Sequence, residues 1–137
     1  MVKIYVIDTN VLIQAPYGLH CFEDNQVVLP VVVLEELDNL KKSDGEIGAN
    51  VRRAIRMLEE LRLQGDLLEG VALPGGGTLR VELNYKDVEL PPDLPDTKSD
   101  NRILKVCMGL SKEKEEQVVL VTKDILLRIK AQIIGIR

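Results

Sequence analysis

Three short apolar runs, rich in β-branched residues, constrain this chain most. They are residues 2–7 (VKIYVI), 26–30 (QVVLP) and 117–122 (QVVLVT). None has the strict polar alternation of a half-exposed strand, so they predict strands covered on both faces, as in parallel sheets. Longer segments with helical periodicity separate them. A chain of 137 residues with this alternation predicts an α/β fold with a mainly parallel central sheet.

Five segments have apolar residues spaced as on one face of a helix: 9–14, 31–42, 47–65, 100–114 and 124–132. Pro30 suits the start of the second, and Gly65 lies beyond the last turn of the third. The expected buried faces of the third and fourth helices comprise Ile47, Val51, Ile55, Leu58 and Leu61, and Ile103, Leu104, Cys107, Met108 and Leu110.

A hairpin and a loop are expected between the third and fourth helices. Residues 67–73 and 78–83 flank the turn sequence PGGG and predict two strands at the edge of the sheet. Residues 84–98 are polar and contain three prolines, which indicates a surface loop. Nothing in the pattern suggests a second domain, so residues 1–137 are interpreted as one.

Acidic residues follow or flank the predicted strands. Asp8 comes directly after the first run, Asp124 closely follows the last, and Asp100 stands where a helix begins. Helical spacing places Glu36 on the side of its helix that carries the apolar residues, and Glu35 toward solvent. Because the working site of an open α/β sheet lies beyond the carboxyl ends of its strands, we expect Asp8, Glu36, Asp100 and Asp124 to meet there.

Four carboxylates cannot share a small pocket as bare anions, because like charges and burial both disfavour ionisation. The sequence offers no obvious buried arginine cluster to neutralise them. Oxygen-only ligands suit Mg²⁺ or Mn²⁺, and a single His with no clustered Cys argues against zinc. Such a site fits metal-assisted hydrolysis of a phosphodiester, in which cations activate the attacking water and hold the leaving oxygen.

Each acid also has a simpler interpretation. Asp8, Asp100 and Asp124 all precede predicted helices and could serve as helix caps. Capping and metal binding are equally expected for Asp8 taken alone, and capping is favoured for the other two. The coincidence of three such acids with a helical Glu at one edge shifts the balance toward metal binding.

Charged and reactive residues elsewhere favour structural roles. Glu35 and Asp38 are expected on solvated helix faces, His20 in a structural or surface position, and both Cys21 and Cys107 as buried thiols. For one set of basic residues, a solvated, salt-bridged helix face is favoured over a rim that contacts RNA phosphates. The set comprises Lys41, Lys42, Arg52, Arg53 and Arg56. The same preference applies to Arg128 and Lys130, which lie beside the last acidic segment.

Four ordered segments carry a family resemblance. YVIDTNVLI, LPVVVLEELDNL, SDNRIL and VVLVTKDILLRIKA resemble the four acidic motifs of the PIN-domain ribonucleases and span nearly the whole chain. VVLEELD, then TKD followed by LRIKA and Gly-Ile, resembles in particular the amino-terminal PIN domain of PhoH-like proteins. The resemblance implies a three-layer α/β/α nuclease domain, here with a small β-hairpin excursion.

The resemblance also assigns roles. It implies that Asp8, Glu36, Asp100 and Asp124 are the catalytic residues and the ligands of Mg²⁺ or Mn²⁺. The small polar residues Asn10 and Thr122 would orient ligands or water. The implied activity is that of a metal-dependent endoribonuclease acting on RNA, single-stranded in the expected case, in the cytoplasm.

Two other functions are compatible with the sequence. The domain could be an RNA-binding or partner-docking module, weakly active or inactive, attached to the ATPase domain of a PhoH-like protein. No GxxxxGK motif followed by Ser or Thr occurs, so that domain would lie outside this chain. A haloacid-dehalogenase-type phosphatase is disfavoured, because that chemistry needs an Asp where Asn10 stands.

Composition narrows the partners only a little. The net charge of −4 argues weakly against a simple nucleic-acid coat protein, although acids gathered around cations would leave the remaining surface near neutral. No apolar run reaches membrane-spanning length, so no membrane association is expected. The sequence leaves homo-oligomer formation open.

Overall fold

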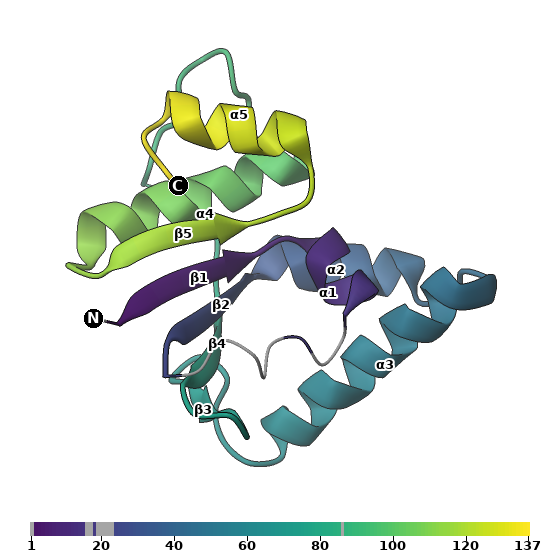
Figure 1. Ribbon diagram of the computed structural model, residues 1–137. Coiled ribbons are helices and arrows are strands. Elements are labelled where there is room, and N and C mark those ends of the chain that lie inside the picture. The colour runs from purple at the N-terminus through teal and green to yellow at the C-terminus, as the bar shows by residue number, and fades with distance from the viewer. Residues whose placement is uncertain (1, 16–17, 19–23, 86) are drawn as a thin grey trace.

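The computed structural model describes residues 2–15, 18, 24–85 and 87–137. The expectations for His20 and Cys21 lie outside these residues. Figure 1 shows a central sheet with α1, α2 and α3 on one side and α4 and α5 on the other. The three-layer α/β/α fold expected from the sequence is therefore confirmed.

The sheet has five strands in the order β3-β4-β2-β1-β5. β1 lies inside the sheet and pairs in parallel with both β2 and β5, β4 is parallel to β2, and β3 pairs antiparallel with β4. The predicted hairpin thus lies at the sheet edge, with β4 fully paired to β2. The strands are Lys3–Ile7 (β1), Gln26–Pro30 (β2), Val71–Ala72 (β3), Thr78–Glu82 (β4) and Gln117–Val121 (β5).

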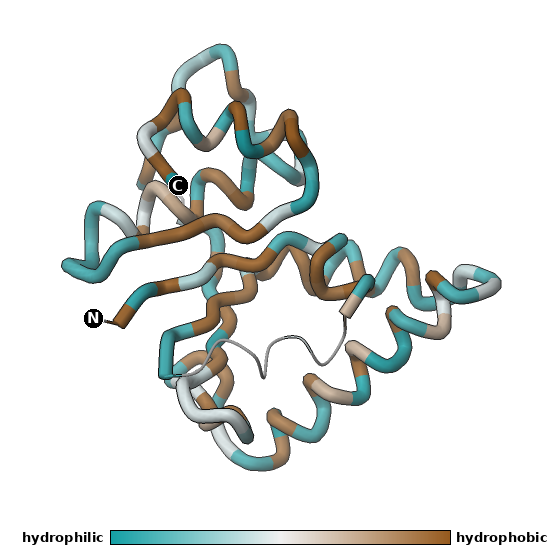
Figure 2. Tube along the Cα trace, in the orientation of Figure 1, coloured by the Kyte–Doolittle hydropathy of each residue, from teal (hydrophilic) through white to brown (hydrophobic). Residues whose placement is uncertain are grey.

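Burial along the strands follows from which faces the helices cover. Residues 27–30 of β2 are all buried, as the continuous apolar run predicts. β4 instead alternates, with Leu79 and Val81 buried and the side chains of Thr78, Arg80 and Glu82 more exposed. Figure 2 shows the hydrophobic colour running along β1, β2 and β5. The core therefore lies around the middle strands of the sheet.

The helices begin and end near the expected residues. Asp8 and Asp124 are the N-caps of α1 and α5, and Pro30 is the N-cap of α2. No helix in the described ranges is long and apolar enough to cross a membrane. The helices are Thr9–Gln14 (α1), Val31–Leu40 (α2), Gly45–Arg62 (α3), Ser99–Glu113 (α4) and Ile125–Ile133 (α5).

The first turn of α3 differs from expectation. The helix begins at Gly45, and Ile47 is 57% exposed rather than part of the buried face. Gly48 is buried instead. It packs so closely against the preceding turn that an added Cβ atom would lie 1.7 Å from the carbonyl oxygen of Ser43. The close approach of the preceding turn fixes which side of the helix faces inward at this end. Further along, Val51 is fully buried as predicted.

Tyr85 anchors the long loop after β4 to α4. Its ring lies against Gly109, where a Cβ atom would come within 2.3 Å of it, and its hydroxyl donates to Glu113 Oε2 at 2.8 Å. Burial, with the Glu113 hydrogen bond, raises the pKa of Tyr85. Met108 was expected to be buried but is only partly so, and the neighbouring Gly109 is buried against the Tyr85 ring. Cys107 is fully buried, as expected.

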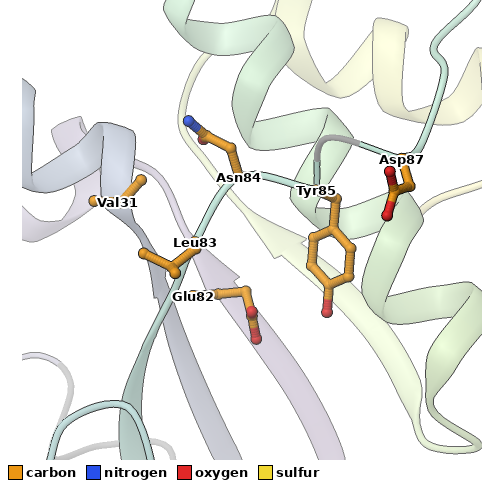
Figure 3. Close-up of a pocket in the computed structure, with 6 residues that line it drawn as sticks. All are labelled: Val31, Glu82, Leu83, Asn84, Tyr85 and Asp87. Atoms are coloured by element: carbon orange, nitrogen blue, oxygen red, sulfur yellow. The ribbon is translucent and has the colours of Figure 1, made fainter.

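The loop leaves a pocket of about 500 Å³ beside the end of β4 (Figure 3). Its lining comprises Val31, Glu82, Leu83, Asn84, Tyr85 and Asp87. Glu82 also pairs with Arg80 on the same strand. The other acid that lines the pocket, Asp87, is exposed to solvent. None of the predicted site residues lines this pocket.

The first strand of the hairpin is shorter than predicted. β3 contains only Val71 and Ala72, whereas the apolar pattern predicted a strand from residue 67. Asp66 Oδ1 accepts the Leu68 backbone N–H at 2.8 Å, and Gly70 adopts a φ of 118°. These two features form a turn where the strand was expected, because Asp side chains and glycine both favour such backbone geometry.

Candidate functional site

All four predicted acids line one open pocket of about 520 Å³ at the carboxyl edge of the sheet. Asp8 follows β1 and Asp124 follows β5, while Glu36 comes from α2 and Asp100 from the first turn of α4. The predicted convergence of these side chains is therefore present. Asn10 also lines the pocket, as do the loop residues Thr97 and Lys98 and the first residue of α4, Ser99.

Asp8 is the most enclosed of the four acids, at 7% exposure. Its Oδ1 accepts the Thr9 backbone N–H at 2.7 Å, and its Oδ2 accepts the Thr122 hydroxyl at 2.6 Å. Burial raises the pKa of Asp8; the two hydrogen bonds oppose this shift, and the charges of Asp124 and Asp100 add to it. The carboxylate caps α1 and also faces the pocket, so the two interpretations of Asp8 are compatible.

Glu36 points toward the same pocket from α2. It is partly buried, whereas neighbouring Glu35 is exposed, as helical spacing predicted. The Thr9 hydroxyl donates to Glu36 Oε1 at 2.8 Å. Burial raises the pKa of Glu36 against this hydrogen bond, and the charges of Asp8 and Asp100 raise it further. Neighbouring carboxylates therefore disfavour the ionisation of both Asp8 and Glu36, and Asp100 acts on each of them.

Asp124 and Asp100 each have a protein partner. Asp124 Oδ1 accepts the backbone N–H groups of Leu126 at 2.9 Å and Leu127 at 3.3 Å, which caps α5. Asp100 Oδ2 forms an ion pair with Lys130 Nζ at 3.1 Å. Asp124 thus both caps its helix and lines the pocket, while Asp100 is partly neutralised from α5.

Thr122, which the family resemblance suggested would orient ligands or water, contacts two of the pocket acids. It is buried, and its hydroxyl donates to Asp8 Oδ2 and accepts the Asp124 backbone N–H at 3.0 Å. One hydroxyl therefore fixes Asp8 in relation to the turn that carries Asp124. Both guanidinium bonds of Arg128, at 3.0 and 2.7 Å, go to the Thr122 carbonyl and hold the same turn.

Three residues in or beside the pocket were not predicted from the sequence to contact or accompany the acids. Thr9 orients both Asp8 and Glu36, and its position directly after Asp8 was the available signal. Lys98 brings a basic side chain to the pocket wall from an exposed loop. Lys130 was considered only as a surface or RNA-contacting charge, but it pairs with Asp100.

The basic residues of α3 make local contacts. Arg52 Nη1 donates to the carbonyls of Lys41 and Ser43, and Arg53 Nη1 donates to Asn50 Oδ1. Lys41 Nζ also pairs with Asp38 Oδ1 at 2.7 Å. The favoured interpretation was a solvated, salt-bridged helix face: Lys41 makes an ion pair, whereas the contacts given for Arg52 and Arg53 are hydrogen bonds to neutral groups.

The donor set suits a hard divalent cation. Four carboxylates line the pocket, and burial together with like charges raises the pKa of Asp8 and Glu36. Among the described residues, however, no three His, Cys, Asp or Glu side chains lie close enough together to hold one ion. The residue types fit such a cation, and binding would require these side chains to close in.

The raised pKa values predict how stability depends on pH. Folded Asp8 and Glu36 hold protons more tightly than in the unfolded chain, so the stabilisation is complete below the ordinary carboxyl pKa and is lost as pH rises through the raised values. Without divalent cations, the free energy of unfolding should fall across this window, and fall less in the Asp8→Asn/Glu36→Gln double variant. Urea unfolding at a series of pH values measures both; parallel curves would contradict the prediction.

Comparison with known proteins gives consistent matches. A family model described as a PIN domain matches residues 5–137. Proteins named PhoH2 are 46% identical in Bacillus subtilis, 40% in Thermobispora bispora and 41% in Mycolicibacterium smegmatis. These matches cover 98–99% of this chain and 30–32% of each relative. The chain therefore spans about a third of the length of these curated relatives.

A solved structure shares the fold. It is a domain of a functionally unknown protein from Methanocaldococcus jannaschii, with a TM-score of 0.62 and 20% sequence identity. The match covers 99% of this chain and 89% of that one. At this identity the likeness concerns the arrangement of the elements alone.

Proposed function

Since the chain belongs to the PIN domain family, we propose that it is a divalent-metal-dependent ribonuclease that hydrolyses RNA phosphodiester bonds. PIN domains are generally metal-dependent nucleases. The observation that carries the proposal is the convergence of Asp8, Glu36, Asp100 and Asp124 in one pocket at the carboxyl edge of the sheet. The PhoH2 relatives, which this chain matches over nearly its whole length, add support.

The four acids would hold one or two Mg²⁺ or Mn²⁺ ions. Bound there, such ions would lower the pKa of an attacking water and neutralise the charge that develops on the phosphate. Burial raises the pKa of Asp8 and Glu36, and the charges of neighbouring carboxylates raise it further; this supports the assignment, because a cation relieves the repulsion. The same relief would make binding stabilise the folded chain.

The protein's own residues set the geometry. Thr9 and Thr122 hold the Asp8 carboxylate through both oxygens, so it enters the pocket with little rotational freedom. Glu36 has one oxygen, Oε1, engaged by the Thr9 hydroxyl. Because Oε1 is engaged and the side chain is only partly buried, Glu36 is placed to accept a proton from a pocket water at Oε2.

We assign an endonucleolytic reaction on single-stranded RNA. The pocket is open to solvent rather than a closed tunnel, which suits a strand lying across it. Lys98 at the pocket wall supplies a positive charge for a backbone phosphate. In a longer, PhoH-like protein of the cytoplasm, this nuclease would act beside an ATPase domain.

The adjacent residues Glu36 and Glu35 provide a matched test. Glu36→Gln should lower Mn²⁺-dependent cleavage of a single-stranded RNA at least about tenfold, because it removes a charged ligand without changing the shape of the side chain. Glu35→Gln makes the same change on the exposed side of the helix and should leave the rate unchanged. Cleavage of a fluorescently labelled RNA, with and without EDTA, measures both; equal rates in the two variants would contradict the proposal.

A second candidate is an RNA-binding or docking module with little activity. The observation that favours it is the spacing of the described acids, which are not close enough to hold an ion as they stand. That candidate expects the wild-type chain to bind RNA equally well with and without Mn²⁺ and to cleave none of it. The same labelled RNA distinguishes the two functions.

A further inference from the structure

Lys130 makes two contacts with the first turn of α4. Its Nζ lies 3.1 Å from Asp100 Oδ2 and 3.1 Å from Asn101 Oδ1. Asn101 is 1% exposed, and its Nδ2 donates to the Pro95 carbonyl at 2.8 Å. The Lys130 ammonium group is therefore held by the Asp100 carboxylate and by the Asn101 amide, which is itself fixed by the Pro95 carbonyl.

The position of Lys130 relative to the pocket is informative. Asp100 lines the pocket, whereas Lys130 is absent from its wall and contacts Asp100 from α5. The side chain of Lys130 is 25% exposed and that of Asp100 is 35% exposed. Lys130 is thus placed to act on the carboxylate, and a substrate in the pocket would meet Asp100 first.

We propose that Lys130 is a built-in counter-cation that competes with the divalent cation for Asp100 and so sets how tightly the pocket binds metal. This inference rests on the proposed function of the same pocket. The ion pair lowers the negative charge of a cluster of four carboxylates. A cation bound at Asp100 loses part of that attraction and is also repelled by the neighbouring ammonium group.

The arrangement of the acids is consistent with this competition. Asp100 adds to the repulsion felt by Asp8 and by Glu36, so it is electrostatically part of their cluster. Yet Asp100 Oδ2 is directed to Lys130, and no three acids of the described chain gather around one point. Release of Asp100 by Lys130 would let its carboxylate turn fully toward the others.

Charge-removing and charge-preserving variants of Lys130 separate this role from a purely structural one. Lys130→Met keeps the length of the side chain and removes its charge, and should bind Mn²⁺ about tenfold more tightly. Lys130→Gln, a second neutral variant, should also bind more tightly, while Lys130→Arg should bind as the wild type does. Isothermal titration with Mn²⁺ alone, without RNA, measures the affinity, and the thermal shift produced by Mn²⁺ should be larger for the neutral variants.

Lys105 provides the matched control. It pairs with Asp96 at 3.1 Å, also a contact between a lysine and the region around the start of α4, but outside the acidic pocket. Lys105→Met should leave the Mn²⁺ affinity unchanged. An equal gain in Lys105→Met, or a gain in Lys130→Arg, would overturn the proposal, because the effect would not depend on charge at Asp100.

Failure of this inference can be told apart from failure of the proposed function. If the wild type binds Mn²⁺ and the neutral Lys130 variants bind it equally or more weakly, the competition is wrong and the metal site remains. Weaker binding in these variants would mean that Lys130 orients Asp100 for the cation. If neither the wild type nor any variant binds Mn²⁺, both the metal-dependent function and this inference are wrong.

Discussion

Replacing Asp8 with Asn is expected to lower metal-dependent RNA cleavage more than about 100-fold while the chain stays folded. Asp8 is the most enclosed acid of the pocket, and both of its oxygens are positioned by hydrogen bonds. Loss of residues that merely orient a metal ligand typically costs 10–100-fold, so loss of the charged ligand itself should exceed that range. The rate of cleavage of single-stranded RNA in Mn²⁺ measures the effect.

The same variant should separate activity from stability. Asn at this position removes a buried charge that its acidic neighbours repel, so without metal Asp8→Asn should unfold at a temperature equal to or above that of the wild type. It should also gain less stability from added Mn²⁺. Asp38→Asn makes the same chemical change on an exposed helix face and should leave cleavage unchanged. Full activity in Asp8→Asn would contradict the assignment of Asp8.

The largest expected effect on stability is at Gly48. A Cβ atom there would lie 1.7 Å from the Ser43 carbonyl oxygen and 2.6 Å from its carbonyl carbon, and backbone atoms cannot rotate away. Gly48→Ala should therefore lower the free energy of unfolding by about 3 kcal/mol, the upper end of ordinary overpacking costs. Urea unfolding followed by circular dichroism measures the loss.

Gly45→Ala is the control for Gly48→Ala. Gly45 begins the same helix with a φ of 74°, but an added Cβ atom would meet nothing within 4 Å. Its cost should come only from backbone strain, about 1 kcal/mol. Equal losses in the two variants would mean that crowding against Ser43 contributes nothing, and that the turn before α3 adjusts freely.

Local patterns predicted the elements and the convergence of the acids. β-branched runs indicated β1, β2 and β5, and helical spacing separated Glu36 from exposed Glu35. The edge of the sheet where the acids meet follows from parallel strand direction, because Asp8 and Asp124 come after neighbouring strands.

Long-range partners could not be predicted in the same way. Thr9 meets Glu36 across 27 residues, and Lys130 meets Asp100 across 30, so both pairs depend on how separate helices pack. The exposure of Ile47 was also missed, because periodicity defines a helix face but does not indicate where a neighbouring turn replaces it. The turn before α3 packs against Gly48, and Ile47 is left exposed although it is hydrophobic.

The hydrogen bond between Thr122 and Asp8 joins residues 114 positions apart in the chain. β5, one of the two sheet neighbours of β1, likewise comes late in the sequence. During synthesis, the first strand must therefore lack this neighbour until β5 has left the ribosome, and closing so long a loop carries an entropic cost. The acidic pocket is consequently among the last features to form, and a truncated nascent chain would not contain it.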